Sequence, residues 1–285
     1  MSIVVTGATG QLGRLIVESL LERGVPASEI TAGGRALERI ADLADRGVTV
    51  VPIDYTDTAT LDAAFAGADV VVLVSSSEVG QRFAQHTNAI AAAVRAGVGR
   101  LVYTSIPKAT ETPMLLASEH KATEDSIVAS GLPYTFLRNA WYTENYTPQI
   151  PGYLEHGVVG AAGEGRVSLA TRADYAAAAA VVASTSGHEN AIYELGGESL
   201  TLTELAAVVA DVTGSDVAYT DVSEEALNGI LVGVGFPEPV AAVFADVDTR
   251  IKAGDLHVTS GHLESLIGRP TTPVRETFAA AAASA

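Results

Sequence analysis

Residues 3–24 read IVVTGATGQLGRLIVESLLERG, and this stretch decides the fold of the chain. It begins as an apolar run of strand length, IVVTG (3–7), that ends in glycine. It continues as QLGRLIVESLLERG (11–24), which repeats apolar side chains on one helical face and stops at a glycine. A buried strand that leads directly into an amphipathic helix is the opening unit of a β-α-β repeat.

The turn between that strand and helix carries three glycines at a fixed spacing. In TGATGQLG (6–13) they are Gly7, Gly10 and Gly13. The first allows a tight turn, the second lets the backbone approach a pyrophosphate, and the third lets the helix pack against the strand. The free N–H groups of the helix N-terminus then face the anion. In this context the spacing predicts a dinucleotide site.

The alternation of apolar runs and helical patterns extends to about residue 140. The further strands expected are EITAGG (29–34), VTVVPID (48–54), DVVVLVSS (69–76), RLVYTSI (100–106) and YTFLRN (134–139). Continuous Val, Ile and Leu runs are typical of parallel strands that helices cover on both faces. The sequence therefore predicts a doubly wound α/β fold of the Rossmann type, with residues 1–140 as the dinucleotide-binding core.

The pattern changes in residues 141–285. The first part, WYTENYTPQIPGYLEHG (141–157), is predicted to be irregular. Later segments predict a helix over 172–184, a strand at 191–197, a helix that begins at a capping box of Thr201 and Glu204, and, from Asp216, a short strand and several helices. We expect this half to complete the sheet and to form a small C-terminal α+β lobe on the substrate side, fused with the core.

Charge is unevenly distributed along the chain. The net charge is −17, and residues 173–249 contain 13 acidic side chains and no Lys or Arg. Such a block repels phosphate backbones and argues against direct nucleic-acid binding. Two interpretations stay open, a solvated acidic surface and an acidic patch for a basic partner.

Composition excludes several kinds of site. Cysteine is absent, so disulfides, thiolate metal sites and cysteine nucleophiles are excluded. The six histidines have no metal-ligand spacing, and we expect no metal. The N-terminus lacks a signal-peptide pattern, and no apolar run reaches about 18 residues, so we expect a cytoplasmic protein without a membrane span.

The end of the second strand selects the nucleotide. An NAD site usually has an acidic residue there, whereas an arginine accommodates a 2′-phosphate. The stretch TAGGRALER (31–39) has Arg35 and no acid before Glu38, which favours NADP(H) over NAD(H). The alternative is that Arg35 is a solvated surface residue. Polar side chains also end three later strands, where ligands bind in open α/β sheets: Asp54, Tyr55, Ser75, Ser76, Ser77, Thr104 and Ser105.

Several segments together are similar to one family. They are TGATGQLG (6–13), SSSEVGQR (75–82), YTS (103–105), HKATE (120–124), YTFLRNAWYTENY (134–146), LEHG (154–157), ATRADYAAA (170–178) and LIGRPTTP (266–273). The chain resembles the NmrA-like atypical short-chain dehydrogenases/reductases, and within them the type 2 NAD(P)H:quinone oxidoreductases and the triphenylmethane dye reductases. The resemblance implies cofactor contacts at Gly7, Ala8, Thr9, Gly10, Gln11, Leu12, Arg35, Ser75, Ser76, Ser77 and Arg172, and a segment that closes over the nicotinamide at Asn139, Ala140, Trp141, Tyr142, Thr143 and Glu144.

The sequence lacks the Tyr-x-x-x-Lys pair that many related carbonyl reductases use. Lys121 is present, but Ala117 stands where the tyrosine would be. Reduction of an ordinary carbonyl gives an alkoxide about as basic as hydroxide. A quinone gives a phenolate-like anion whose conjugate acid has a pKa of about 10, so it needs roughly 7–8 kcal/mol less help from a proton donor. The absence of the tyrosine therefore suits a quinone or a similar aromatic acceptor.

The hypothesis is direct hydride transfer from NADPH to a quinone, without flavin. Trp141 and Tyr142 are candidate pocket walls, and Asn139 would orient the substrate. Lys121 would hold the nicotinamide ribose or stabilise the developing oxyanion; alternatively it is a surface lysine paired with Glu124 or Asp125. His120 either faces the pocket or is a helix residue with a satisfied ring, and Trp141 is either a wall or core. NADH is a second possible donor.

The alternative hypothesis is a non-catalytic NAD(P) sensor of the NmrA type, which the absence of a tyrosine at position 117 also permits. The acidic block of residues 173–249 would then be its partner surface. The aromatic closing segment over residues 139–144 favours the reductase, because a sensor does not require it. A homo-oligomer is compatible with either function.

Overall fold

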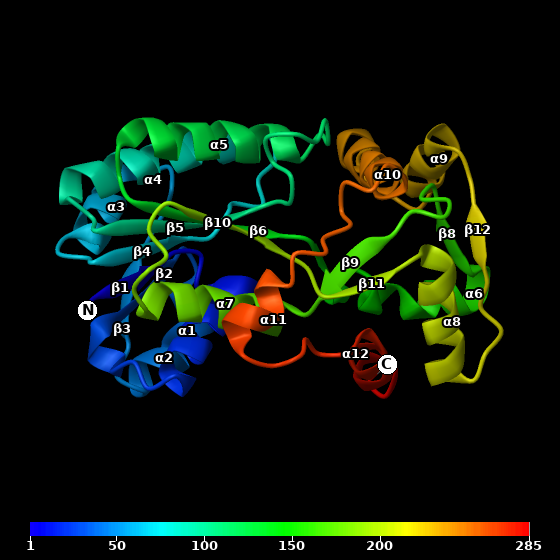
Figure 1. Ribbon diagram of the computed structural model, residues 1–285, viewed down its shortest axis with the longest axis horizontal. Coiled ribbons are helices and arrows are strands. Elements are labelled where there is room, and N and C mark those ends of the chain that lie inside the picture. The colour runs from blue at the N-terminus through cyan, green and yellow to red at the C-terminus, as the bar shows by residue number, and fades with distance from the viewer. Residues whose placement is uncertain (285) are drawn as a thin grey trace.

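The computed structural model describes residues 1–284, and its centre is a seven-stranded parallel sheet. The strand order is β10-β6-β5-β4-β1-β2-β3 (Figure 1). The strands are β1 (Ile3–Val5), β2 (Ile30–Gly34), β3 (Thr49–Pro52), β4 (Val70–Leu73), β5 (Arg100–Ser105), β6 (Tyr134–Asn139) and β10 (Ala191–Leu195). The predicted doubly wound α/β fold is confirmed.

Helices cover both faces of this sheet. One face carries α1 (Gln11–Glu22), α7 (Arg172–Ser184) and α11 (His262–Ile267), and the other carries α3 (Thr58–Phe65), α4 (Arg82–Ala96) and α5 (Ala117–Ser130) (Figure 1). Consecutive strand residues enter opposite layers, since Val71 packs in the α3–α4–α5 layer and Val72 in the α1–α7 layer. This two-sided burial explains why the strands read as continuous apolar runs.

The strand order fixes where a ligand can bind. From β1 the chain runs outward through β2 and β3 on one side, and then crosses to β4 on the other side. The direction of the crossovers reverses between β1 and β4, and in open α/β sheets ligands bind beyond the carboxyl ends of strands at such a point. The glycine turn directly follows β1 and therefore lies at this crevice.

The remaining residues form a lobe beside the carboxyl ends of β5 and β6, on the right of Figure 1. It contains two small sheets, β11-β9-β7 and β12-β8. Its strands are β7 (Trp141–Tyr142), β8 (Val158–Gly160), β9 (Val167–Ala170), β11 (Glu198–Leu200) and β12 (Tyr219–Asp221). Its helices are α6 (Ile150–His156), α8 (Leu202–Thr213), α9 (Glu224–Gly233), α10 (Glu238–Lys252) and α12 (Val274–Ala282). A separate apolar cluster, with Leu205, Val209 and Phe278 at its centre, holds these elements together.

Three predicted features of the second half of the chain are present in the structure. The helix over 172–184 and the strand from Ala191 occur as predicted, and Thr201 and Glu204 form both hydrogen bonds of the capping box. Residues 141–157 are more regular than predicted. Trp141 pairs with Leu169 in β7–β9, a partner far away in sequence, and α6 begins with a proline in its first turn, where the missing N–H costs nothing.

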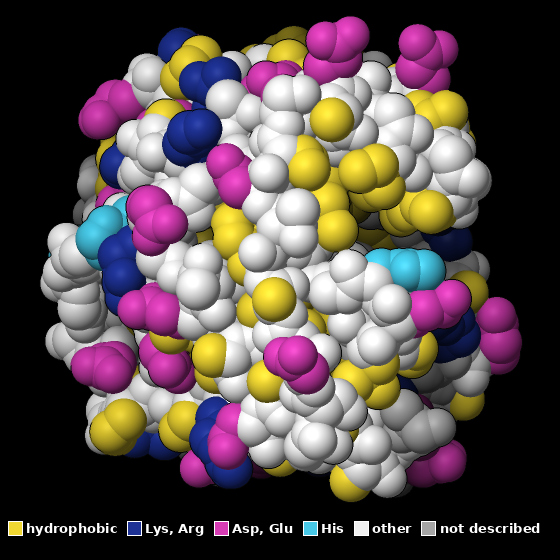
Figure 2. All heavy atoms as spheres, turned by 90° about the vertical axis from the view of Figure 1, so that its right-hand side faces the viewer, with side chains coloured by type: hydrophobic (Ala, Val, Ile, Leu, Met, Phe, Trp, Pro, Cys, Tyr) yellow, Lys and Arg dark blue, Asp and Glu magenta, His cyan; other side chains and the backbone are white. Residues whose placement is uncertain are grey.

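The outer face of the lobe carries both charge and exposed apolar side chains. Figure 2 shows Asp and Glu scattered over this face, and apolar side chains gathered over its upper part, where α9 and α10 lie in Figure 1. The exposed large apolar residues of α9, α10 and the turn between them are Ile230, Val232, Val234, Phe236, Val240 and Phe244. Among residues 1–284, no helix combines the length and hydrophobicity that a membrane span requires.

Candidate active site

The glycine turn after β1 is shaped by close backbone contacts. Gly7 has a φ of +60°, which favours glycine, and its carbonyl accepts the N–H of Gly10 across 2.9 Å. A β-carbon on Gly13 would lie 2.3 Å from the carbonyl oxygen of Gly7. Glycine is therefore required at Gly13 so that α1 can pack against the turn, which is the role the sequence pattern predicts.

The N-terminus of α1 is free to bind an anion. Gly10 is the N-cap residue, no side chain caps the helix, and its first turn has no acidic residue. The first N–H groups of a helix have no partner within it, and the helix dipole favours negative charge at that end. Ala8, Thr9, Gln11 and Leu12 complete this turn, and the arrangement fits a pyrophosphate.

The loop also touches the end of β2. A β-carbon on Gly34 would lie 2.4 Å from the hydroxyl oxygen of Thr9, so the two backbones approach closely. Arg35 follows directly and is 66% exposed at its side chain. Its Nη2 lies 2.9 Å from Oε1 of Glu78 in the connection between β4 and α4. Arg35 thus lies beside the glycine turn, as a 2′-phosphate site requires, and its guanidinium is paired with the carboxylate of Glu78.

Polar groups tie together the carboxyl ends of β1, β3 and β4. The hydroxyl of Tyr55 lies 2.6 Å from that of Thr6 and donates to the carbonyl of Val74 across 2.7 Å. Burial raises the pKa of Tyr55, so its phenol stays protonated. Asp54 accepts from the N–H and the hydroxyl of Thr56, and these bonds lower its pKa. These contacts organise the edge of the sheet where Asp54 and Tyr55 were predicted to meet the adenine.

Side chains from neighbouring elements position Ser75 and Ser76. The N–H of Ser75 donates to the hydroxyl of Thr104 across 2.9 Å. The N–H of Ser76 donates to Nε2 of His86 across 3.0 Å, and Arg82 donates to the carbonyl of Ser76 across 2.6 Å.

Burial lowers the pKa of His86 to about 3, so the ring stays neutral and can accept that bond. His86 and Arg82 were not predicted to take part in the site. Their signal is a histidine and an arginine four residues apart in the helix that follows a serine-rich strand end.

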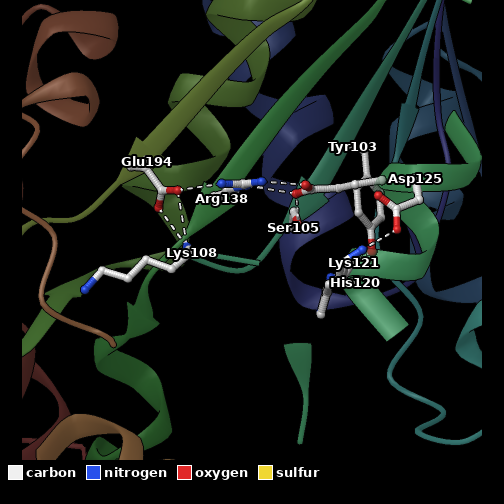
Figure 3. Close-up of polar contacts among 9 residues, drawn as sticks. Tyr103, Ser105, Lys108, His120, Lys121, Asp125, Arg138 and Glu194 are labelled. Carbon is white, nitrogen blue, oxygen red and sulfur yellow. Dashed lines mark hydrogen bonds and ion pairs between the residues drawn. The ribbon is translucent and has the colours of Figure 1, made fainter. Parts of the chain in front are cut away.

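A buried ion-pair network lies beside the end of β5. The carboxylate of Glu124 accepts from the hydroxyl of Ser105 across 2.6 Å and from Arg138 across 2.6 and 3.0 Å. Arg138 also donates to Glu194, which accepts the backbone N–H of Lys108 (Figure 3). Since its hydroxyl is engaged by Glu124, Ser105 joins the sheet edge to α5.

Lys121 and His120 follow one another in α5 but face different surroundings. Nζ of Lys121 lies 2.5 Å from Asp125, and its side chain is 49% exposed (Figure 3). This is one of the two surface pairs considered in the alternative interpretation. His120 is only 7% exposed, and its Nδ1 lies 2.7 Å from the hydroxyl of Tyr103. Within residues 1–284 Lys121 therefore binds an exposed carboxylate and no buried group, whereas His120 belongs to the interior.

The segment from Asn139 to Glu144 links β6 to the lobe. The amide of Asn139 lies 3.5 Å from the hydroxyl of Tyr142, while Oδ1 of Asn139 is buried without a partner in residues 1–284. Arg172 lies over the ring of Tyr142, at 4.9 Å from its centroid, and its backbone N–H donates to Glu144. A fully buried acceptor without a partner is energetically costly, which makes the Asn139 side chain unusual in this segment.

The rest of this segment is anchored in both cores. The N–H of Ala140 donates to the carbonyl of Leu195 across 2.8 Å. Trp141 is half-buried against the lobe core, and Thr143 is fully buried, with its hydroxyl oxygen unpartnered in the described residues. A segment fixed at both ends and lined by aromatic rings can present a flat wall to a ligand at the end of β6.

Comparisons with known proteins match this architecture over nearly the whole chain. Quinone oxidoreductase 2 of Escherichia coli strain K12 is 49% identical over 276 residues, which covers 96% of each chain. The crystal structure of an NADPH-dependent quinone oxidoreductase from Escherichia coli, complexed with NADPH, superposes with a TM-score of 0.95 at 47% identity and covers 98% of this chain and 99% of that one. The triphenylmethane reductase of Citrobacter sp., complexed with NADP(H), gives a TM-score of 0.92 at 40% identity and covers 98% and 100%.

A sequence model of one protein family also matches residues 1–253. It accounts for the glycine turn, the doubly wound sheet and most of the lobe in a single match. On these grounds the chain belongs to the NmrA-like family.

Proposed function

We propose that this protein is an NADPH-dependent oxidoreductase that transfers a hydride directly to a quinone or a similar small aromatic acceptor. The observation that carries the proposal is the 49% identity to a quinone oxidoreductase along 96% of both chains. The glycine turn, the uncapped N-terminus of α1 and the adjacent Arg35 support a dinucleotide with a 2′-phosphate. We place the acceptor between the ends of β5 and β6 and the aromatic segment that follows β6.

In this proposal the chain mainly binds and orients. The turn from Gly7 to Leu12 holds the pyrophosphate, and Arg35 leaves Glu78 to bind the 2′-phosphate. Ser75, Ser76, Ser77 and Thr104 line the path toward the nicotinamide, and Asp54 and Tyr55 line the adenine end. When bound, NADPH supplies the hydride.

We assign Asn139 to the nicotinamide amide, and because its Oδ1 is fully buried and unpartnered among residues 1–284, the segment after β6 must shift before the two groups meet. Tyr142 and Trp141 form walls for the acceptor, and Arg172 and Glu144 keep Tyr142 in place. Lys121 holds the nicotinamide ribose once it leaves Asp125. Positioning of two reactants by itself can supply several kcal/mol toward a reaction that needs no strong acid.

Other parts of this function stay predictions. They are that no flavin or metal takes part, that NADH serves as a second donor, that the protein works in the cytoplasm, and that the chain forms a homo-oligomer. None of them is required for the test of the main proposal.

The test is oxidation of NADPH by the purified protein, followed by the loss of nicotinamide absorbance, with and without a small quinone and without added flavin. Quinone-dependent oxidation that falls when Arg35 is replaced by Ala is the expected result. Tight NADPH binding with no turnover on any quinone would contradict the proposal and point instead to a sensor. Arg46→Ala is the matched control, because Arg46 is an exposed arginine at the end of α2 (Ala41–Asp45), without a predicted phosphate contact.

A further inference from the structure

His120 is a buried histidine whose hydrogen bonding is only half complete. The hydroxyl of Tyr103 lies 2.7 Å from Nδ1 of His120 in the interior (Figure 3). Burial raises the pKa of Tyr103, so the phenol keeps its proton, and Nδ1 of His120 is the one partner of this hydroxyl among residues 1–284, so we assign the phenol as the donor. Nδ1 is therefore the acceptor, and a neutral ring then carries its single N–H at Nε2.

The surroundings keep the ring neutral. Burial lowers the pKa of His120 well below its usual range, and the positive charge of Arg82 and the proximity of His86 act in the same direction. No carboxylate pairs with the ring in the described part of the chain. His120 can thus donate a hydrogen bond from Nε2 without giving up its proton.

Nε2 is left for a ligand. It has no hydrogen-bond partner among residues 1–284, yet it is not one of the fully buried unpartnered atoms of that range. Nε2 is therefore not completely enclosed, although His120 as a whole is only 7% exposed. A nearly buried N–H without an acceptor is costly, and a ligand oxygen would remove that cost.

The ring of His120 also lies near the carboxyl edge of the sheet. Tyr103 is two residues before the carboxyl end of β5, and the neighbouring Glu119 accepts the backbone N–H groups of Gly80 and Phe83 after β4. His120 thus lies beside the carboxyl half of β5, next to the connection that follows β4. In α5 it follows Ala117 by three residues, which places the two on the same helical face. Ala117 is the position at which related carbonyl reductases have their tyrosine.

We propose that Nε2–H of His120 donates a hydrogen bond to the quinone oxygen that becomes negative during hydride transfer. This inference rests on the proposed function. The quinone gains the hydride and its electron pair and becomes a hydroquinone monoanion, while NADPH is oxidised to NADP⁺. The proton that completes the hydroquinone comes from water, and His120 keeps its own. A fixed donor of this kind stabilises the anion more than the neutral quinone.

Two substitutions distinguish loss of the Nε2–H donor from loss of the rest of the His120 ring. In His120→Asn the amide can still bond to Tyr103, but nothing occupies the position of Nε2. In His120→Gln the amide nitrogen reaches the position of Nε2, so the donor is retained. We expect turnover with a quinone to fall about tenfold to a hundredfold in the Asn variant, as for loss of a hydrogen bond to a charged group. The Gln variant should recover most of this loss, and the affinity for NADPH should stay unchanged in both.

The dependence of turnover on the choice of quinone provides a more specific test. Quinones with electron-donating substituents give more basic anions, so the loss in His120→Asn should grow along a series from halogenated to methylated quinones. A cationic triphenylmethane dye takes a hydride at carbon and forms no oxyanion, so its reduction should change by less than about twofold. Tyr103→Phe removes the hydroxyl that donates to Nδ1, so the ring proton of His120 is no longer fixed at Nε2. The loss of turnover in this variant should follow the same trend along the quinone series, with a smaller magnitude.

These experiments distinguish failure of the proposed role of His120 from failure of the proposed function. An equal loss along the whole quinone series, or no loss at all, would overturn the role of His120 while leaving the reductase proposal intact. A wild-type protein that binds NADPH but reduces no quinone would instead overturn the proposed function, and the role of His120 with it. If His120→Asn does not fold, the comparison of His120→Gln and Tyr103→Phe along the same series decides the question.

Discussion

Arg35 and Glu78 form an ion pair, with Nη2 and Oε1 2.9 Å apart, although one follows β2 and the other follows β4. The pair joins the end of β2 to the connection after β4, beside the glycine turn that follows β1. A 2′-phosphate that binds Arg35 must therefore displace the carboxylate of Glu78. Glu78 also accepts from the amide of Gln85, which holds it in place.

Replacement of Glu78 by Gln should strengthen NADPH binding. Exposed ion pairs contribute about 0.2–1 kcal/mol, so the gain should be at most about fivefold in Kd. Arg35→Ala should weaken NADPH binding about tenfold to a hundredfold, as for loss of a charge-assisted hydrogen bond, and should leave NADH binding nearly unchanged. Titration of both nucleotides by protein fluorescence measures this. An equal effect of either substitution on NADH would show that Arg35 does not read the 2′-phosphate.

Gly13→Ala should damage both stability and cofactor binding. Its β-carbon would lie 2.3 Å from the carbonyl oxygen of Gly7, so α1 must shift away from the turn. Overpacking of this kind costs about 1–3 kcal/mol. Gly229→Ala in α9 is the control, because a β-carbon there meets nothing within 4 Å and should be neutral or stabilising. Urea unfolding and NADPH titration of the two variants give the comparison, and equal behaviour would contradict the predicted packing role.

The buried pair of Glu124 and Arg138 should show strong coupling. Glu124→Leu leaves the guanidinium with fewer partners in the interior, and loss of one member of a buried pair costs about 3–5 kcal/mol. The double variant with Arg138→Met should lose less than the sum of the two single variants. The exposed pair of Arg95 and Asp62 is the matched control, and its disruption should cost less than about 1 kcal/mol. A double variant whose loss equals the sum would show that the two side chains act independently.

Lys121→Met tests the predicted contact with the nicotinamide ribose. Among the described residues 1–284, Lys121 binds only Asp125 at the surface, so any contact with the cofactor requires that pair to open. We expect NADPH affinity to fall severalfold in Lys121→Met and to rise slightly in Asp125→Asn. Equilibrium titration and steady-state kinetics measure both effects. Unchanged affinity and turnover in Lys121→Met would mean that Lys121 is a surface residue with a purely local pair.

Asp248 should make stability fall as the pH rises. Burial raises its pKa from 3.8 to about 6, against the opposing bond from the N–H of Ala161. The native state therefore holds a proton that the unfolded chain has released between about pH 4 and about pH 6, and the free energy of unfolding falls across that window. The full loss is at most about 3 kcal/mol above pH 6.

Asp248→Asn keeps an acceptor for Ala161 and removes the charge. It should be more stable than wild type by about 1–3 kcal/mol at pH 7, with a smaller gain at pH 5. Denaturant unfolding at the two pH values measures this. Asp216→Asn, at an exposed position, should change neither value. A gain that does not depend on pH would show that the benefit comes from packing.

Sequence reasoning found the parts of this protein that depend on short stretches of chain. The apolar runs of the seven strands, the glycine spacing from Gly7 to Gly13 and the capping box at Thr201 are all local patterns, and the structure contains each of them. Their physical causes act within a few residues, through side-chain periodicity, backbone freedom and a helix end. For that reason the doubly wound fold and the glycine turn after β1 could be predicted from sequence alone.

Only the tertiary structure decided which polar groups are free. Arg35 could be placed beside the phosphate loop from sequence, but its pairing with Glu78 depends on how two distant strand ends meet. Lys121 and His120 are neighbours in sequence, yet one binds a surface carboxylate and the other shares a buried bond with Tyr103. Such contacts join residues that are far apart along the chain or on different helical faces. Their energies depend on burial and distance, which exist only once the sheet and its helices have packed.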